Sequence, residues 1–301
     1  MDKKASIHVP CVATIGFFDG VHRGHVCLIE QLQEVAKERD LKSLLVTFDR
    51  HPRTVVSPGH VPTLLTTLEE KEQLLRKTGV DEIAVLPFTQ ELSRLTAREF
   101  MEQVLKKELN VCVLVLGYDH AFGHGGGSWN DYVRWGEETG IEVVRAHEFE
   151  TLMVSSSKCR RLLEQGNVEG AAEMLGRWYS LSGEVVKGFH VGHELGFPTA
   201  NLQPDAEKLL PAHGAYAVWC LLEDGTRLGG MLNIGNRPTI GNGEAVSVEV
   251  NLLDYDGNLY GHHITLDFVG RLREEQRFAS RDELIRQLKQ DEKQARKILQ
   301  A

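Results

Sequence analysis

Short apolar runs alternate with helical patterns through the first half of the chain. The runs that predict buried strands lie at residues 12–15, 44–48, 82–86, 111–116 and 141–144. Between them, apolar residues recur at helical spacing, and two capping-box sequences, at residues 67–70 and 96–99, predict helix starts. This alternation predicts an α/β fold: an open, doubly wound parallel sheet with helices on both faces. Ligands are then expected at the carboxyl ends of its strands.

The pattern changes near residue 179. Short strand-like runs, broken by glycine, aspartate and asparagine, occupy residues 183–186, 216–222, 231–234, 246–253 and 263–268. The pairs Asp224-Gly225 and Asp256-Gly257 are typical of hairpin turns. These features predict a small antiparallel β-barrel or sandwich with a terminal helix over residues 282–299. We therefore expect two domains, residues 1–178 and 179–301, with a helical stretch over residues 164–175 bridging them.

Composition narrows the class of protein. The 301 residues carry a formal net charge of −9, which argues against a general nucleic-acid binder but permits local basic pockets. The five cysteines are odd in number and form no CxxC pair, so neither a disulfide framework nor a structural zinc site is expected. Reduced cysteines indicate a cytoplasmic protein. We find no apolar run that predicts a signal peptide or a membrane span, and expect a monomer or weak homo-oligomer.

The strongest local signal is residues 16–25 (GFFDGVHRGH), between a predicted strand and a predicted helix. Free backbone N–H groups and the positive end of the helix dipole suit a phosphate at such a place. His22 and His25 add further donors. Taken alone, the segment could also be a structural accident or a fragment of a metal site.

A second segment places three hydroxyls before a helical run. These hydroxyls are either an N-cap cluster or part of an anion site. The residues concerned are Ser155, Ser156 and Ser157 and the following Lys158, Arg160 and Arg161.

Together these two segments resemble the nucleotidyltransferase superfamily and, more narrowly, the adenylyltransferase module of bacterial bifunctional riboflavin kinase/FAD synthetases. Residues 46–52 (VTFDRHP) and 117–123 (GYDHAFG) are similar to two further motifs of that family. Asp49 and Asp119 can alternatively be simple turn formers. The nucleotide-binding residues that the resemblance implies are Gly16, Phe17, Phe18, Asp19, Gly20, Gly24, Ser155, Ser156 and Ser157. The implied flavin-binding residues are Phe48, His51, Pro52, Asp119 and Phe122.

The chemistry implied for this Rossmann-like domain is adenylyl transfer. The phosphate of FMN attacks the α-phosphorus of ATP, and pyrophosphate leaves. Because that phosphate is already a nucleophile, no general base is required. Alignment and charge neutralisation by His22, His25, Arg160 and Mg²⁺ would supply the catalysis.

The second domain contains residues 196–201 (GFPTAN). The Thr199 hydroxyl and the Asn201 amide oxygen can act as hard ligands for Mg²⁺, although the segment alone could be a simple turn. It resembles the riboflavin kinase signature, and residues 233–239 (NIGNRPT), 248–254 and 268–278 resemble other parts of that family. The resemblance implies that nucleotide is bound by Asn233, Arg237, Pro238 and Thr239. It implies that flavin is bound by Arg271, Arg273 and Glu274, which could otherwise be a solvated charged helix start.

Glu249 is the predicted catalytic base. It alternates with Val248 and Val250, so a strand would turn it to the opposite face, either as a rim charge or as a site group. In the kinase family the matching glutamate accepts the proton of the ribityl hydroxyl of riboflavin, a poor nucleophile without a base.

Several positions depart from the family pattern: Arg50, His120, Ser157 and Cys159 in the first domain, and His193 and Asn251 in the second. Our leading hypothesis is a bifunctional enzyme that converts riboflavin and ATP to FMN, then FMN and ATP to FAD. The departures motivate an alternative with one active half. A non-catalytic flavin-nucleotide sensor or carrier is a third possibility, and a cytidylyltransferase leaves residues 183–301 unexplained.

Overall fold

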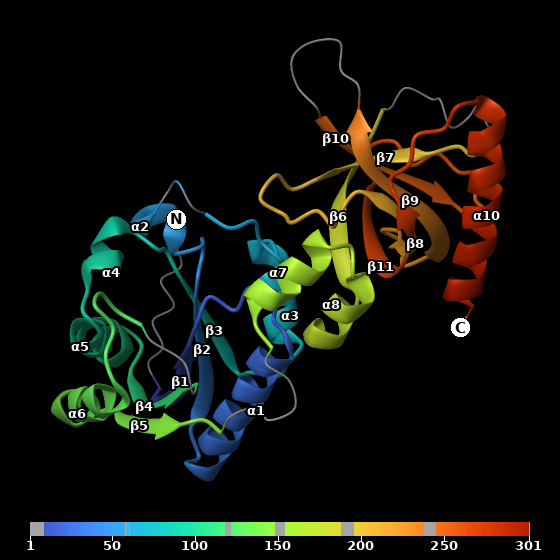
Figure 1. Cartoon of the computed structure of the whole chain (residues 1–301). Helices are drawn as coiled ribbons and strands as arrows, with labels where there is room; N and C mark the ends of the chain where they lie inside the picture. Colours follow the sequence, from blue (N-terminus) through green and yellow to red (C-terminus); the bar gives the residue numbers. More distant parts are fainter. Residues whose placement is uncertain are drawn as a thin grey trace. The chain divides into compact units, whose positions relative to one another are not determined.

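The computed structural model describes residues 9–57, 59, 61–117, 122–147, 154–187, 196–237 and 245–300. The chain divides into two compact units, Met1–Val154 and Ser155–Ala301 (Figure 1). The helices over residues 156–175 thus group with the second unit. The functional domain boundary at residue 178 stays a prediction.

The first unit is built on a five-stranded parallel sheet in the order β3-β2-β1-β4-β5. Its strands are β1 (Cys11–Ile15), β2 (Lys42–Phe48), β3 (Glu82–Leu86), β4 (Val111–Leu116) and β5 (Glu142–Arg145). The predicted parallel sheet is confirmed. Strand order reverses between β1 and β4, so the loop after β1 leaves the sheet at the point where open α/β sheets bind ligands.

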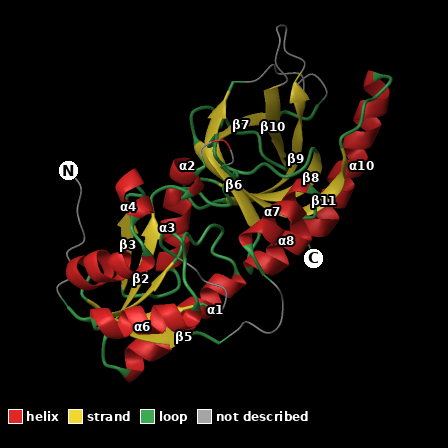
Figure 2. Cartoon of the chain, turned by 60° about the vertical axis from the view of Figure 1, so that its left-hand side comes forward, coloured by secondary structure: helices red, strands yellow, loops and turns green. Residues whose placement is uncertain are grey.

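Helices cover both faces of this sheet (Figure 2). The helices of this unit are α1 (Arg23–Glu38), α2 (Arg53–Val56), α3 (Leu68–Arg76), α4 (Gln90–Arg94), α5 (Ala97–Phe100), the π-helix η2 (Met101–Glu108) and α6 (Trp129–Thr139). Both predicted capping boxes are present, at Thr67 with Glu70 and at Thr96 with Glu99. Buried residues pack α1 against one face of β1 and β4, and α5, η2 and α6 against the other.

The second unit is a closed antiparallel barrel rather than a sandwich, with strand order β10-β7-β6-β11-β8-β9. Its strands are β6 (Tyr179–Val186), β7 (Ala200–Pro204), β8 (Gly214–Leu221), β9 (Arg227–Arg237), β10 (Ala245–Leu252) and β11 (His263–Glu274). The predicted terminal helix is confirmed as α10 (Arg281–Leu299), and it packs on β8, β9 and β11.

One predicted helix is interrupted. The stretch over residues 164–175 consists of the end of α7 (Ser156–Glu164) and a separate helix α8 (Val168–Leu175). Gly166 lies between them with φ +75°, a left-handed conformation that ends a helix. Within the described parts of the chain, none of the helices combines the length and apolar character that crossing a bilayer requires.

Candidate active sites

The loop that follows β1 has an unusual backbone. Phe18 (φ +56°), Gly20 (φ +78°) and Val21 (φ +38°) all have positive φ. Such angles strain residues that carry a Cβ, β-branched ones most of all, and persist only where the surroundings enforce them. The backbone N–H of Gly16 donates to the Val46 carbonyl at 3.0 Å, which joins the loop to β2.

Asp19 holds this loop in place. Its side chain is buried, and its carboxylate accepts hydrogen bonds from the backbone N–H groups of Leu65 (3.0 Å) and Thr66 (3.1 Å). The Thr66 hydroxyl donates to the same carboxylate at 3.2 Å and accepts from the Gly20 N–H at 3.0 Å. The carboxylate therefore ties the loop to the segment before α3. Its predicted contact with nucleotide stays a prediction.

The two histidines stack at the first turn of α1. Their ring centroids are 3.6 Å apart, with an angle of 15° between the planes. His22 is the N-cap residue: its Nδ1 accepts a hydrogen bond from the backbone N–H of His25 at 3.3 Å. In the neutral ring the proton of His22 is therefore on Nε2. A Cβ at position 24 would lie 3.3 Å from the His22 ring, which explains the glycine there.

Aromatic residues gather at the carboxyl ends of β1 and β2. The Phe17 and His51 rings meet edge to face, 4.8 Å between centroids. The Lys71 ammonium lies 4.1 Å from the Phe17 ring centroid and donates to the Phe48 carbonyl at 2.8 Å. Burial lowers the pKa of Lys71 from 10.5 to about 8. Sequence reasoning missed Lys71, although its spacing from Leu75 places it on the buried face of α3.

The remaining first-unit candidates have structural partners. Asp49 accepts from the Phe88 N–H at 2.9 Å and pairs with Arg50 at 3.0 Å, consistent with a turn former. Pro52 is the N-cap residue of α2. The backbone of Phe122 exchanges hydrogen bonds with the Tyr132 hydroxyl. Asp119 and His120 lie outside the described residues.

The hydroxyl cluster begins α7. The Ser155 side chain accepts from the Lys158 N–H at 3.2 Å, so the N-cap role is confirmed. Ser156, Ser157 and Arg160 follow on α7. Because this helix groups with the second compact unit, the predicted joint action with His22 and His25 stays a prediction.

Barrel register brings three separately predicted residues into one row. Glu249 on β10 pairs with Asn201 on β7 and with Asn233 on β9. Directly opposed residues of antiparallel strands point to the same face, so these side chains are neighbours. Glu249 lies between the buried Val248 and Val250 along its strand, so it faces away from them, as predicted.

Asn201 provides the test of the predicted Mg²⁺ site. This side chain is buried, and its Oδ1 atom has no hydrogen-bond partner. A buried amide oxygen without a donor fits a hard cation, whose preferred ligands are such oxygens. The Asn251 amide donates to the Pro198 carbonyl at 2.7 Å, next to Thr199. Asn251, one of the departures from the family pattern, therefore supplies a hydrogen-bond donor beside this segment.

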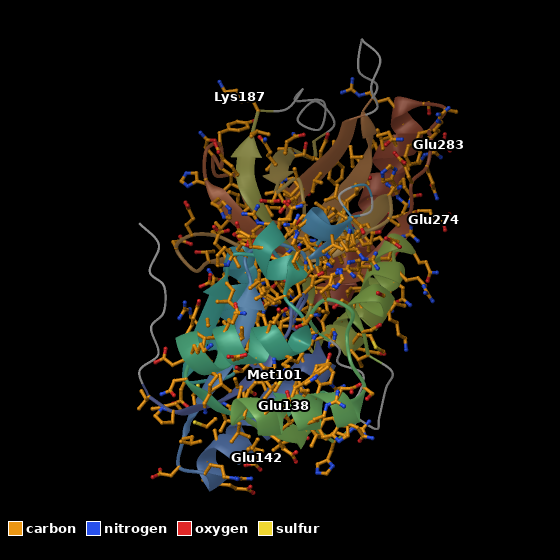
Figure 3. The ribbon with its side chains drawn as sticks, turned by 90° about the vertical axis from the view of Figure 1, so that its left-hand side faces the viewer. Met101, Glu138, Glu142, Lys187, Glu274 and Glu283 are labelled. Carbon is orange, nitrogen blue, oxygen red and sulfur yellow. The ribbon has the colours of Figure 1, made fainter. Side chains whose placement is uncertain are left out.

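The charged residues at the end of β11 are largely engaged within the unit. Arg273 pairs with Asp291 of α10 at 2.8 Å, with both side chains largely buried. Arg271 donates to the carbonyls of His213 (2.8 Å) and Gln165 (3.3 Å). The Glu274 side chain, labelled in Figure 3, is 84% exposed. Flavin contact by these three residues stays a prediction.

Some of the predicted nucleotide-binding residues lie outside the part of the chain that the structure describes. Pro238 and Thr239 are not among the described residues, and neither is the departure at His193. Arg237 is described only as the last residue of β9.

Family models match both units. The model for FAD synthetase matches residues 4–158, and that for riboflavin kinase matches residues 175–299. The two matches follow one another along the chain in the order that the sequence motifs predicted.

Curated relatives match nearly the whole chain. The bifunctional riboflavin kinase/FMN adenylyltransferase of Escherichia coli K12 is 39% identical, over 96% of this chain and 92% of that protein. The protein of that name from Listeria monocytogenes is 34% identical, over 95% and 91%. A crystal structure described as a macrolide-efflux protein from Streptococcus pneumoniae is 30% identical, with TM-score 0.89 over 98% of this chain and 97% of that one. Its description names an activity unlike that of the curated relatives.

Proposed function

The chain belongs to the bifunctional riboflavin kinase/FMN adenylyltransferase family, and from that premise we propose how its residues carry out the two reactions. The proposal is supported by the proximity of predicted site residues to one another within each of the two units. His22 and His25 stack at the first turn of α1, and Glu249 stands between Asn201 and Asn233.

In the kinase reaction, Glu249 acts as the general base. Its carboxylate accepts the proton of the terminal ribityl hydroxyl as that oxygen bonds to the γ-phosphorus of ATP, and the bond to ADP breaks. Asn201 Oδ1 and the Thr199 hydroxyl would hold Mg²⁺. When bound, the ion supplies positive charge to the phosphates. Asn233, adjacent to Glu249 in the barrel register, would bind nucleotide.

In the adenylyl transfer, an FMN phosphate oxygen bonds to the α-phosphorus of ATP and pyrophosphate leaves. The Nδ1 atom of His22 accepts the capping hydrogen bond of α1, so in the neutral ring Nε2 carries the proton that would be donated to a phosphate oxygen. His25, the dipole of α1 and Arg160 would add positive potential as charge develops. Phe17, Phe48 and His51 would contact the rings of the flavin and of the nucleotide.

We also propose that the protein acts in the cytoplasm on small molecules, as a monomer or weak homo-oligomer without nucleic-acid or membrane partners. The net charge of −9 supports the absence of a nucleic-acid partner, since nucleic-acid binding domains are generally basic.

Product analysis tests the proposal. Purified protein with riboflavin, ATP and Mg²⁺ should yield FMN and then FAD on chromatography. His25→Ala should abolish FAD formation and spare FMN formation, and Glu249→Ala should do the reverse. FMN without FAD in the wild type would contradict the adenylyltransferase assignment. Flavin binding without turnover, unchanged by Glu249→Gln, would favour the sensor or carrier.

A further inference from the structure

Lys71 is a buried charge that neither proposed mechanism uses. Its side chain is 2% exposed and is among the largest fully buried side chains of the described residues. Its ammonium contacts the Phe48 carbonyl at 2.8 Å and the face of the Phe17 ring at 4.1 Å from the centroid. Both contacts are made to residues at the carboxyl ends of β1 and β2, where the sheet is expected to bind ligands.

The Lys71 ammonium does not form a direct hydrogen bond with a carboxylate among its described contacts. Its hydrogen-bond acceptor is a backbone carbonyl rather than a carboxylate. Asp19, Asp49 and Glu72 favour the charged form through space, but burial outweighs them. Burying an ammonium costs free energy that an apolar side chain at this helix position would not cost. A cost of this kind at a predicted ligand site indicates a role in that site.

The aromatic contacts indicate what the role is. Lys71 lies over one face of Phe17, while His51 meets the same ring at 4.8 Å. His51 is held in turn, because its Nδ1 accepts from the Arg53 N–H at 3.1 Å. A cation over a ring restrains the orientation of that ring, and a charge-assisted hydrogen bond restrains the strand end.

We propose that Lys71 is a positioning residue of the adenylyl-transfer site. Its ammonium fixes the Phe17 ring and the end of β2, so that Phe17 and His51 present a preorganised surface to a planar heteroaromatic ring, that of adenine or of the flavin. The proposal rests on the adenylyltransferase activity proposed above.

The charge on Lys71 makes the proposal testable by pH. The pKa of about 8 means that the ammonium loses its proton within an accessible range. The neutral amine loses the cation–π attraction to Phe17 and the charge-assisted part of its hydrogen bond to Phe48. The charged groups that act on this ammonium through space are Asp19, Glu72 and Asp49, and His51 contacts the same Phe17 ring. In FAD formation, the KM for FMN or the KM for ATP should therefore rise as the pH increases through about 8.

The experiment compares four proteins in the full chain: wild type, Lys71→Met, Lys71→Arg and the exposed control Lys77→Met. KM and kcat for FMN and for ATP are measured in FAD formation across about pH 7 to 9.5, and FMN formation in the same samples monitors the barrel unit. Lys71→Met should raise one KM about tenfold with a smaller change in kcat, because it removes a charged contact. Lys71→Arg, whose guanidinium stays protonated, should retain FAD formation and lose the rise of KM near pH 8.

Several outcomes would overturn the proposal. One is a Lys71→Met protein with both KM values within about twofold of wild type. Another is a rise of KM with pH that Lys71→Arg shares with the wild type. If Lys71→Met does not fold, the pH dependence of KM in the wild type tests the proposal instead. Wild-type KM values for FMN and ATP that stay constant through about pH 8 contradict it. A wild type that makes FMN but no FAD refutes the adenylyltransferase assignment instead.

Discussion

Asp19→Asn should release the loop after β1 from the segment that precedes α3. The substitution changes almost no volume but replaces a carboxylate oxygen with an NH₂ group. In the wild type, the Leu65 N–H lies 3.0 and 3.1 Å from the two carboxylate oxygens, and the Thr66 N–H lies 3.1 Å from Oδ1. After substitution at least one of these donors faces another donor or shares a single weaker acceptor.

The magnitude follows from the burial of these groups. A hydrogen bond to a charged group contributes about 1.5–3 kcal/mol, and a buried donor left unsatisfied costs a similar amount. We expect the loop contact to weaken by about 2–3 kcal/mol, which corresponds to roughly 30- to 150-fold faster local opening.

Amide hydrogen exchange measures this directly, since the donors are backbone N–H groups. The amides of Leu65 and Thr66 should exchange faster in Asp19→Asn by that factor, and FAD formation should fall because the same loop leads to His22. Asp40→Asn is the matched control: Asp40 is exposed with φ +53°, a conformation that asparagine tolerates. Unchanged protection of Leu65 and Thr66 in Asp19→Asn would refute the reasoning.

Three further predictions concern the buried polar groups. Asn201→Ala should raise the Mg²⁺ concentration needed for half-maximal FMN formation and leave that for FAD formation unchanged, which a metal titration of each reaction checks. Asp291→Asn should destabilise the barrel unit by about 3 kcal/mol, because it leaves the largely buried Arg273 without its anionic partner; urea unfolding measures this. The folded-state pKa of Lys71, about 8, lies below its ordinary value of 10.5, so the unfolded chain binds more protons between these pH values. Stability should therefore rise from about pH 8 to about 10.5 in the wild type, and Lys71→Met should flatten that rise in unfolding series at several pH values.

The parallel sheet could be predicted from the sequence because its signals are local. Strand periodicity and capping boxes each depend on a few neighbouring residues, and Thr67 with Glu70 formed as expected. Two local features were harder to predict. A simple turn is one alternative for residues 196–201, but Ala200 begins β7, whose pairing with β6 and β10 depends on distant strands. The sequence pattern over residues 164–175 predicts one helical stretch, but Gly166, with φ +75°, separates α7 from α8.

The site geometry was less accessible for a different reason. Asn201, Asn233 and Glu249 could each be singled out, but their alignment depends on strand register between segments far apart in the chain. Register is set by the whole barrel, and a slip of one residue turns a side chain to the other face. Lys71 shows the complementary difficulty, since a lysine on an apolar helix face is normally expected to reach solvent.

The closure of the barrel has a consequence for the order in which the protein folds during synthesis. β6 pairs with β7, the next strand, but also with β11, the last, so the barrel cannot close before residue 274 has left the ribosome. The sheet of the first unit needs nothing beyond β5, which ends at Arg145. Domains fold as units and non-local pairing is slow, so the first unit should acquire its structure well ahead of the second. The helix with Ser155–Arg160 belongs to the late unit: Leu163 accepts from the N–H of Ala212, and α8 packs on β6 and β11. A nascent chain halted near residue 178 would therefore carry a folded parallel sheet, while the helix with Arg160 would still lack the barrel strands on which its unit depends.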